Sequence, residues 1–437
     1  MRFIHAADIH LGYRQYNNSE RYNDFARAFH HMVDDVIRRK ADFVLLAGDL
    51  FHKRSIEPRT LLQATAMLER LRNAGIPVIA IEGNHERAYQ QDGFSWLDYL
   101  AEVGLLTLLT PIYRDGRIQI EPWDAELRSG AYIDLPGGVR IIGVKYYGAS
   151  TPRVIQDLCD ELESMSGPRP PYTIIMLHAG VHGVLDNMSG ALSRAQLDPL
   201  RAHCQYLALG HIHKPFIQDD WIYNPGSLET NSVTEVEWDD RGYLMVDIDM
   251  DAADGPTHSV TAVPSSRRPF IRLRFAVDEC RTPEHLYTML EAYLRRRAPA
   301  EPSETKPVVE LQLYGILPFS HSDLDLKRVE GMAQEALNPL ICNVRDITTP
   351  SEFDMRVGDN MSRAELEQYV IRELIERDIR RRDNSQQWAD MVLRLKGLAL
   401  SGGTPEEVVA ELSAFRAAIP PESLGDTKDD DKEDAPL

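Results

Sequence analysis

The chain has 437 residues, of which 43% are hydrophobic and 27% are charged. This length suits about three folded domains, and the composition excludes wholesale disorder. The formal net charge is −20, from 48 basic and 68 acidic residues, which excludes a protein that holds nucleic acid by bulk positive charge alone. Any nucleic-acid partner is therefore expected to be bound locally or with the help of another protein.

Residues 1–255 are expected to form a layered α/β domain. Short runs rich in Val and Ile, typical of buried strands, alternate with amphipathic stretches such as 25–39 and 59–72, which predict helices. The runs end in Asp, Asn or His instead of ordinary turn residues. In such domains functional groups gather at the ends of the strands, so this pattern predicts a site at that place.

A Pro- and Ser-rich stretch over 256–269 reads as a linker to a second, smaller module at 268–350. Its pattern alternates strands and helices, and it contains no cluster of catalytic residue types. We therefore expect a binding or covering module. The predicted elements are strands at 270–277, 308–316 and 341–347 and helices at 285–297 and 326–337.

The segment 360–420 is expected to be helical. A capping box begins at Ser362, and Thr404 followed by Pro405 starts a further helix. The densest basic cluster, Arg377 with Arg380 to Arg382, reads by default as a solvated helix face. Residues 421–437 are acid-rich and are expected to be a disordered tail.

The cysteines and the hydropathy pattern indicate a reducing, cytoplasmic location. The four cysteines are far apart and form no CxxC pair: Cys159, Cys204, Cys280 and Cys342. The N-terminus reaches a charge before a signal-peptide run develops, and no stretch of about 18 apolar residues occurs. Neither secretion nor membrane spanning is expected.

Five strand ends together supply a set of oxygen and imidazole ligands. A single His at a strand end is often structural, but chance does not readily place the whole ordered set. Two divalent ions need several ligands each and one bridging carboxylate, for which Asp49 is the natural choice. Ligation without thiolate suits manganese, iron or zinc better than copper. The predicted metal ligands are Asp8, His10, Asp49, Asn84, His178, His211 and His213.

The motifs that carry these residues resemble the five signature motifs of the calcineurin-like metallophosphoesterases. They are Asp8-Ile9-His10, Gly48-Asp49, Gly83-Asn84-His85-Glu86, Leu177-His178 and Gly210-His211-Ile212-His213. The longer phrases Ala47-Gly48-Asp49-Leu50-Phe51-His52 and Asn224-Pro225-Gly226-Ser227-Leu228-Glu229 are similar to those of the meiotic recombination eleven family of double-strand-break repair nucleases, called SbcD in bacteria. The resemblance implies a calcineurin-like β-sandwich flanked by helices, a small α/β capping domain and a C-terminal helical segment.

The resemblance also implies the role of each site residue. Two Mn²⁺ per subunit are expected, one held by Asp8, His10, Asp49 and His213 and the other by Asp49, Asn84, His178 and His211. His85 would face the scissile phosphate to stabilise charge or to protonate the leaving oxygen. His52 would be an accessory catalytic group, with a structural loop histidine as the alternative. The nucleophile would be a water molecule.

The implied function is manganese-dependent cleavage of DNA at its ends, as exonuclease and endonuclease, by a prokaryotic, nucleoid-associated enzyme. The resemblance also implies a homodimer, with contacts around Leu61, Leu62, Leu97 and Leu100, bound to an SMC-like coiled-coil ATPase of the SbcC type. The alternative for each of these leucines is that it covers its own sheet. Residues 268–350 would be the capping module that binds DNA, and 360–420 would bind the ATPase. The alternative for 360–420 is a self-contained helical bundle.

Two other functions remain open from the sequence. A calcineurin-like phosphoesterase that acts on a non-DNA phosphoester would carry the same metal motifs, because these specify phosphate chemistry and not the attached alcohol. A scaffold subunit with vestigial chemistry is the other, and the completeness of the seven-ligand set argues against it.

Overall fold

The computed structural model describes residues 1–89, 93–114, 116–185, 191–298, 305–350, 363–376, 384–400 and 404–418. The acidic tail predicted at 421–437 and the basic cluster at Arg377 and Arg380 to Arg382 lie outside these residues. The chain divides into two compact units. The first comprises Met1–Phe275, Leu290–Leu313 and Leu326–Asp346, and the second Ala276–Met289, Tyr314–Asp325 and the described residues from Ile347 onward.

Two six-stranded sheets form the centre of the first unit. The first sheet has the order β14 (Thr257–Pro264), β13 (Gly242–Asp249), β1 (Arg2–Ala6), β2 (Phe43–Leu46), β3 (Val78–Ala80) and β4 (Thr107–Leu108). The second has the order β11 (Phe216–Gln218), β12 (Ile222–Asn224), β10 (Tyr206–Gly210), β9 (Tyr172–His178), β8 (Val139–Val144) and β7 (Tyr132–Leu135). Strands β1 to β4 run parallel, as do β8, β9, β10 and β12. A small hairpin pairs β5 (Ile112–Arg114) with β6 (Arg117–Gln119).

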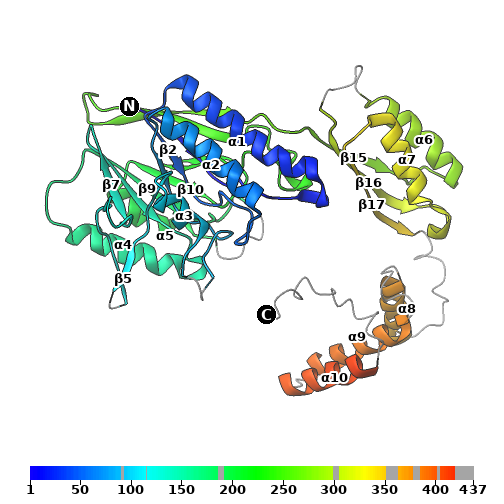
Figure 1. The fold of residues 1–437 in the computed structure, drawn as a ribbon. Helices are drawn as coiled ribbons and strands as arrows, with labels where there is room; N and C mark the ends of the chain where they lie inside the picture. The colour runs from blue at the N-terminus through cyan, green and yellow to red at the C-terminus, as the bar shows by residue number, and fades with distance from the viewer. Residues whose placement is uncertain are drawn as a thin grey trace, which may run out of the picture. The chain divides into compact units, whose positions relative to one another are not determined.

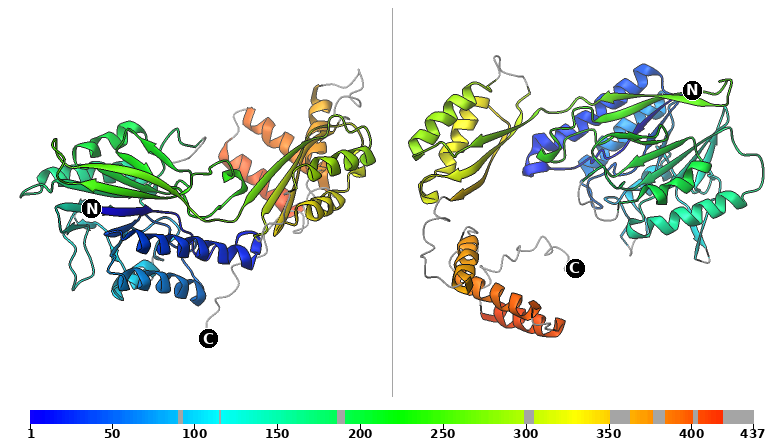
Figure 2. Two further views of the ribbon diagram at one scale, coloured as in Figure 1. Left: turned by 90° about the horizontal axis from the view of Figure 1, so that it is seen from above. Right: turned by 180° about the vertical axis from the view of Figure 1, so that it is seen from behind.

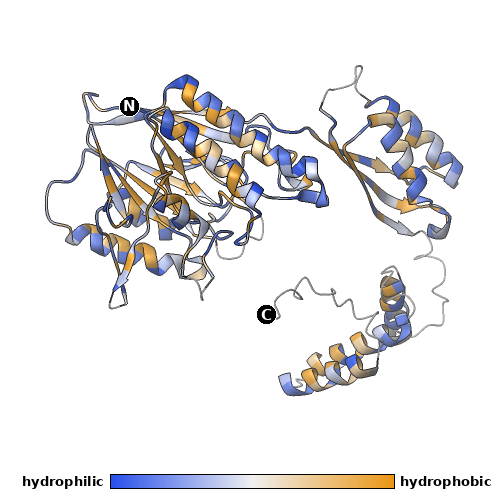
Figure 3. Cartoon of the chain, in the orientation of Figure 1, coloured by the Kyte–Doolittle hydropathy of each residue, from blue (hydrophilic) through white to orange (hydrophobic). Residues whose placement is uncertain are grey.

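Alternation along the strands divides the apolar side chains between two layers of core. Phe3 and Phe43 face the second sheet, where their rings stack at 5.0 Å and Phe3 meets Tyr206 edge to face at 5.2 Å. The intervening residues Ile4 and Val44 face the helices instead. Because successive side chains of a strand point to opposite faces, nearly continuous apolar strands fill both layers, and Figure 3 shows these strands mostly in orange.

Helices cover the outer face of each sheet. The first sheet packs on α1 (Ser19–Arg39), α2 (Pro58–Asn73) and α3 (Trp96–Glu102), and the second on α4 (Thr151–Ser164) and α5 (Arg194–Leu197). Figures 1 and 2 show the resulting four layers, with the two sheets between the helices. The predicted α/β class, a β-sandwich flanked by helices, is confirmed.

Two of the four leucines that we expected at a dimer contact are core residues. Leu97 and Leu100 of α3 are 1% and 0% exposed and pack against the first sheet. They have no surface to offer a second subunit, so this part of the expectation is wrong. Leu61 is partly buried against the same core, whereas Leu62 is 67% exposed.

The elements predicted over 268–350 are present. A three-stranded sheet has the order β15 (Phe270–Ala276), β16 (Val308–Leu317) and β17 (Ile341–Pro350), and the helices are α6 (Pro283–Arg295) and α7 (Leu326–Leu337). Alternate residues such as Leu273 and Phe275 of β15 are buried, as expected of a sheet with one covered face. That residues 268–350 form a separate capping module that binds DNA stays a prediction.

The C-terminal segment forms the helices α8 (Arg363–Glu376), α9 (Ser385–Leu400) and α10 (Pro405–Ala418). These helices contact one another: Trp388 meets Phe415 at 4.7 Å, Gln368 donates a hydrogen bond to Asp390 at 2.7 Å, and Arg394 pairs with Glu411 at 3.0 Å. They therefore pack as a small bundle. No helix in the described part of the chain is long and apolar enough to cross a membrane.

Candidate metal centre

The seven predicted ligands meet at the carboxyl ends of the parallel strands. Asp8, Asp49 and Asn84 follow β1, β2 and β3, while His178 ends β9 and His211 follows β10. His178 is in register with Gly210 of β10, which brings His211 beside it. Backbone hydrogen bonds also join the first two loops, since the Asp8 N–H donates to Gly48 at 3.1 Å. The topology therefore brings five segments to one edge.

The backbone at this edge is strained. Asp8, His10 and Asp49 have φ values of 51°, 52° and 54°, and His211 has φ of 95°. Residues with a Cβ rarely adopt positive φ, and such strain persists only where the surrounding structure determines the conformation. The strain coincides with the predicted ligands, which is typical of a functional site.

Glycine is required next to the ligands because backbone and side chains approach closely there. A Cβ at Gly83 would lie 2.1 Å from Oδ1 of Asp49, and one at Gly210 would lie 2.1 Å from the carbonyl oxygen of Ala47. Any larger residue would displace these atoms. This explains in physical terms why glycine precedes Asn84 and His211 in the motifs.

Asp8, His10 and His213 form the first group of candidate ligands. Their ligand atoms all lie within 4.8 Å of one another, and Nε2 of His10 is 3.1 Å from Nε2 of His213. Asp8 accepts the backbone N–H of His211 at 3.1 and 2.9 Å. Nδ1 of His10 is buried and has no hydrogen-bond partner among the described residues. Nitrogen lone pairs that converge in this way fit a cation between them.

Asp49, His178 and His211 form the second group, also within 4.8 Å. Nε2 of His178 lies 3.3 Å from Oδ2 of Asp49 and 3.1 Å from Oδ1 of Asn84, which is 2.8 Å from Nδ1 of His211. Nδ1 of His178 donates to the carbonyl of Ala47 at 2.7 Å. That hydrogen bond fixes the tautomer and leaves Nε2 as the ligand atom.

The electrostatics of the centre follow from its burial. Burial would raise the pKa of Asp49, but the charge and hydrogen bond of His178 outweigh it and hold that pKa below its usual range. Burial opposes the charged form of His178, yet Asp49 raises its pKa to about 9. Burial raises the pKa of Asp8 to about 6 and lowers the pKa of His10. The charge of Asp49 thus favours the protonated form of His178 at neutral pH.

Metal binding at neutral pH is expected to release protons. His178 with a pKa of about 9 must lose its proton before Nε2 can bind a cation. The affinity for a divalent cation should therefore rise between pH 7 and pH 9, by up to about tenfold per pH unit for one released proton. Isothermal titration calorimetry in buffers of different ionisation enthalpy measures the release. Heats that do not depend on the buffer would contradict it.

His85 and His52 lie beside these two groups and form a third one with His10, whose ligand atoms also lie within 4.8 Å of one another. Nδ1 of His85 donates to the carbonyl of His52 at 2.7 Å, and the two rings are 5.2 Å apart. Tyr13 stacks on His52 at 3.8 Å. Burial, with the positive charges of His85 and Lys53, lowers the pKa of His52 to about 4. The hydrogen bond leaves Nε2 of His85 available for proton exchange.

Two buried carboxylates at the centre were not singled out from the sequence. Glu86 accepts the backbone N–H groups of Asp49 at 3.0 Å, Gly83 at 3.2 Å and Phe51 at 2.7 Å, so it ties two motif loops together. Burial, together with the negative charge of Asp49, raises the pKa of Glu86 to about 8. The position of Glu86 directly after His85 in the motif was the signal in the sequence that could have indicated its role. Glu235, which binds His213, has no motif around it.

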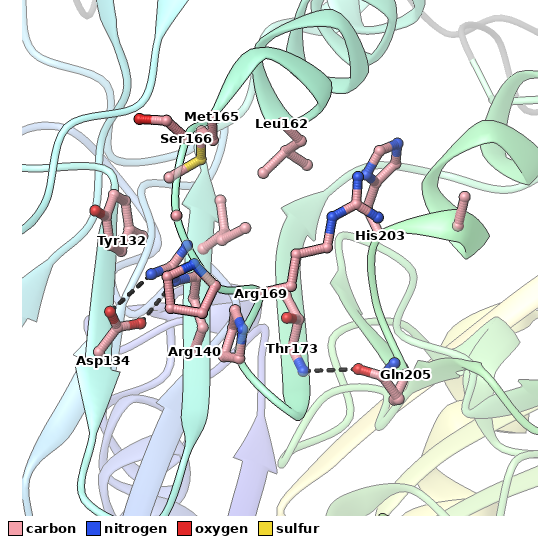
Figure 4. A pocket seen from close by; sticks show the side chains of 15 residues that line it. Tyr132, Asp134, Arg140, Leu162, Met165, Ser166, Arg169, Thr173, His203 and Gln205 are labelled. Atoms are coloured by element: carbon pink, nitrogen blue, oxygen red, sulfur yellow. Dashed lines mark hydrogen bonds and ion pairs between the residues drawn. The ribbon is translucent and has the colours of Figure 1, made fainter. Parts of the chain in front are cut away.

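A separate cavity of about 510 Å³ has none of the predicted site residues in its lining. In Figure 4 the guanidinium of Arg140 points to Asp134, to which it donates at 2.6 and 2.8 Å. Arg169 and His203 line another part of this cavity. The Asp134 of this ion pair is 54% exposed, and the cavity contains none of the converging ligands found at the strand ends.

Comparison with known proteins agrees with this geometry. Residues 1–215 match the calcineurin-like phosphoesterase family. The chain is 32% identical over 242 residues to the DNA double-strand break repair protein Mre11 of Archaeoglobus fulgidus, covering 54% of this chain and 52% of that protein. It is 31% identical over 283 residues to that of Haloferax volcanii, covering 64% and 56%. The chain thus spans about half the length of these relatives, and the resemblance indicated by the motifs is confirmed.

Proposed function

Since residues 1–215 belong to the calcineurin-like phosphoesterase family, we propose that the protein is a manganese-dependent DNA nuclease. It hydrolyses phosphodiester bonds at DNA ends, as exonuclease and endonuclease, in double-strand-break repair in the prokaryotic nucleoid. The observation that carries this proposal is the convergence of seven oxygen and imidazole ligands at one edge. The likeness to archaeal Mre11 proteins supports DNA as the substrate.

The centre is proposed to hold two Mn²⁺ per subunit, one on Asp8, His10, Asp49 and His213 and the other on Asp49, Asn84, His178 and His211. A donor set of oxygen and imidazole without thiolate suits this metal. Two such cations, when bound, provide an activated water and stabilise the charge of the phosphate. Asp49 is proposed as the shared ligand, because one carboxylate can offer an oxygen to each cation, and its Oδ2 lies 3.3 Å from Nε2 of His178.

His85 is proposed to contact the scissile phosphate. The hydrogen bond from its Nδ1 to the carbonyl of His52 holds the ring in place, so Nε2 can donate a proton to the departing sugar oxygen. His52, held by the stacked ring of Tyr13, is the accessory group. This division keeps proton transfer separate from metal ligation.

Local positive charge around the centre reconciles a DNA substrate with a net charge of −20. Lys53 and Arg54 directly follow His52, Arg87 follows Glu86, and all three are exposed. Arg54 also lies over the ring of Tyr89 at 5.9 Å. Phosphates that flank the scissile bond would meet these side chains, which favours a polymeric substrate over a small phosphoester.

The test is a comparison of substrates with the purified chain and Mn²⁺. A labelled DNA duplex should be degraded, a generic phosphomonoester should be hydrolysed far more slowly, and chelation of the metal should stop both reactions. Rapid hydrolysis of the monoester with intact DNA would favour the alternative function, a phosphoesterase acting on a non-DNA substrate.

We also propose that the protein is a homodimer through α2 and α3. These helices carry exposed apolar side chains: Leu62 is 67%, Trp96 37% and Tyr99 39% exposed. Leu62→Asp should convert the dimer to a folded monomer, because it places a charge on the contact. Light scattering measures the change. Leu127→Asp, at a leucine that is 72% exposed outside these helices, is the matched control, and equal masses for the two variants would reject this interface.

The bundle of α8, α9 and α10 is proposed to dock on an SMC-like coiled-coil ATPase. Apolar side chains remain exposed on these helices, with Leu374 53%, Leu400 78% and Val409 61% exposed, and an apolar helix face suits contact with a partner. Deletion of residues 359–437 should leave Mn²⁺-dependent nuclease activity intact but abolish co-purification with the ATPase. Tight binding of the ATPase by the truncated chain would contradict this assignment.

A further inference from the structure

The predicted ligand His213 is held by a buried network of hydrogen bonds and ion pairs. We propose that Glu235 positions His213 for metal binding, and that the contacts behind Glu235 make this positioning dependent on Arg268, at the end of the linker 256–269. The inference rests on the proposed function, because it assumes a cation at His213. It assigns a role to buried groups that the proposed reaction does not otherwise use.

Glu235 holds the histidine through one oxygen and is itself held through the other. Oε1 accepts Nδ1–H of His213 at 2.8 Å, and Oε2 accepts Arg241 at 2.5 Å and the backbone N–H of Asn231 at 2.9 Å. The residue is 5% exposed and ends the short 3-10 helix Val233–Glu235. With both oxygens engaged, the carboxylate cannot rotate away. The lone pair of His213 Nε2 is thereby directed at Nε2 of His10, 3.1 Å away.

The hydrogen-bond network continues from Glu235 through Arg241, which is 1% exposed. Arg241 donates to Oγ1 of Thr230 at 2.8 Å, and the backbone N–H of Thr230 donates to Glu229 at 2.7 Å. Glu229 accepts the backbone N–H of Arg268 at 3.2 Å. Each contact is direct, so a shift of one member moves the next.

Arg268 lies at the end of this network that is farthest from His213. Its guanidinium donates to Asp24 at 2.6 and 3.0 Å, and to the carbonyl of Lys306 at 2.5 Å. Arg21 closes the network by donating to Asp24 at 2.6 Å and to Glu229 at 3.3 Å. Arg268 lies two residues before β15, and Lys306 lies two residues before β16. A displacement of these strand starts would therefore act on Glu229 and, through it, on His213.

Stability alone does not account for this network. Three arginines and three carboxylates are buried in it: Arg21, Arg241, Arg268, Asp24, Glu229 and Glu235. Desolvation of buried ion pairs consumes most of their mutual attraction, and apolar residues of similar volume are often at least as stabilising. Such a network instead holds its side chains in one defined arrangement. Here it fixes the position of the predicted ligand His213. Mutation of the hydrogen-bond partner of a ligating histidine typically lowers metal affinity about 10- to 100-fold.

The test measures the two Mn²⁺ affinities of the full chain separately, by calorimetry, with no substrate present. Glu235→Gln retains the size of the side chain but removes its charge. We expect one site to weaken by about 10- to 100-fold and the other to stay within about threefold. Arg268→Gln, which does not touch His213, should weaken the same site by a smaller factor. Two unchanged affinities in Glu235→Gln would overturn the positioning role, and two unchanged affinities in Arg268→Gln would overturn the coupling.

Asp35→Asn is the matched control for loss of a buried carboxylate. Asp35 is 6% exposed and accepts hydrogen bonds from Tyr243, Arg38 and Arg39, which are not part of the network behind His213. It should lower the thermal unfolding temperature without changing either affinity. If Glu235→Gln does not fold, Arg268→Gln decides alone, and unchanged affinities then overturn the whole inference. A wild-type chain that binds no Mn²⁺ would instead refute the proposed function.

Discussion

Asp49→Ala is expected to abolish metal-dependent DNA cleavage while the chain stays folded. Oδ2 of Asp49 lies 3.3 Å from Nε2 of His178, and Oδ1 accepts the backbone N–H of His85 at 3.0 Å. Because Asp49 is the proposed shared ligand, we expect neither cation to be retained in place without it. Since metal ions contribute several kcal/mol of transition-state stabilisation and each 1.4 kcal/mol corresponds to about tenfold in rate, the loss should exceed about 1,000-fold.

His213→Ala provides the comparison for this variant, because His213 is the proposed ligand of one cation and Asp49 that of both. Activity should again be lost, but Mn²⁺ binding should weaken mainly at one site. Circular dichroism checks that both variants fold, and a labelled duplex reports the rate. Wild-type Mn²⁺-dependent cleavage by either variant would show that the assignment of two metal sites is wrong.

His85→Gln should lower nuclease activity by about 100- to 10,000-fold, the usual contribution of a general acid or base. The side chain is predicted to touch the substrate and not the metals, so both cations should remain bound. The backbone N–H of His85, which donates to Asp49, is unaffected by the change.

His182→Gln is the matched control for the His85 variant. His182 is an exposed histidine that follows His178 by four residues, and it belongs to none of the three groups of candidate metal ligands among the described residues. Its replacement should leave the rate unchanged. Calorimetry of His85→Gln gives the decisive reading, because loss of Mn²⁺ binding would move His85 into the ligand set.

The strand ends could be predicted from the sequence because two signals coincide there. Apolar runs mark Phe3 to Ala7 and Tyr206 to Leu209 as strands, and the Asp and His that follow them are unusual at a strand end. Parallel pairing then brings the groups together without any further information. The strained φ values at Asp8 and Asp49 could not be predicted, since they follow from contacts between segments far apart in the chain.

Other features depended on contacts that periodicity does not reveal. The spacing of Leu97 and Leu100 identifies an apolar helix face but not its partner, and the structure buries both against the first sheet. Glu235 and Arg241 resemble ordinary surface charges in the sequence, yet they are 5% and 1% exposed. Their role depends on His213, 22 residues away from Glu235. Burial of paired charges is a property of the tertiary fold.

We propose above all that Asp49 joins two metal sites into one catalytic centre. Electron paramagnetic resonance of the full chain titrated with Mn²⁺ tests it most directly. We expect two Mn²⁺ bound per chain with the spectrum of an exchange-coupled pair, and loss of that coupling in Asp49→Ala. A single bound Mn²⁺, or two ions with the spectra of isolated Mn²⁺, would contradict it.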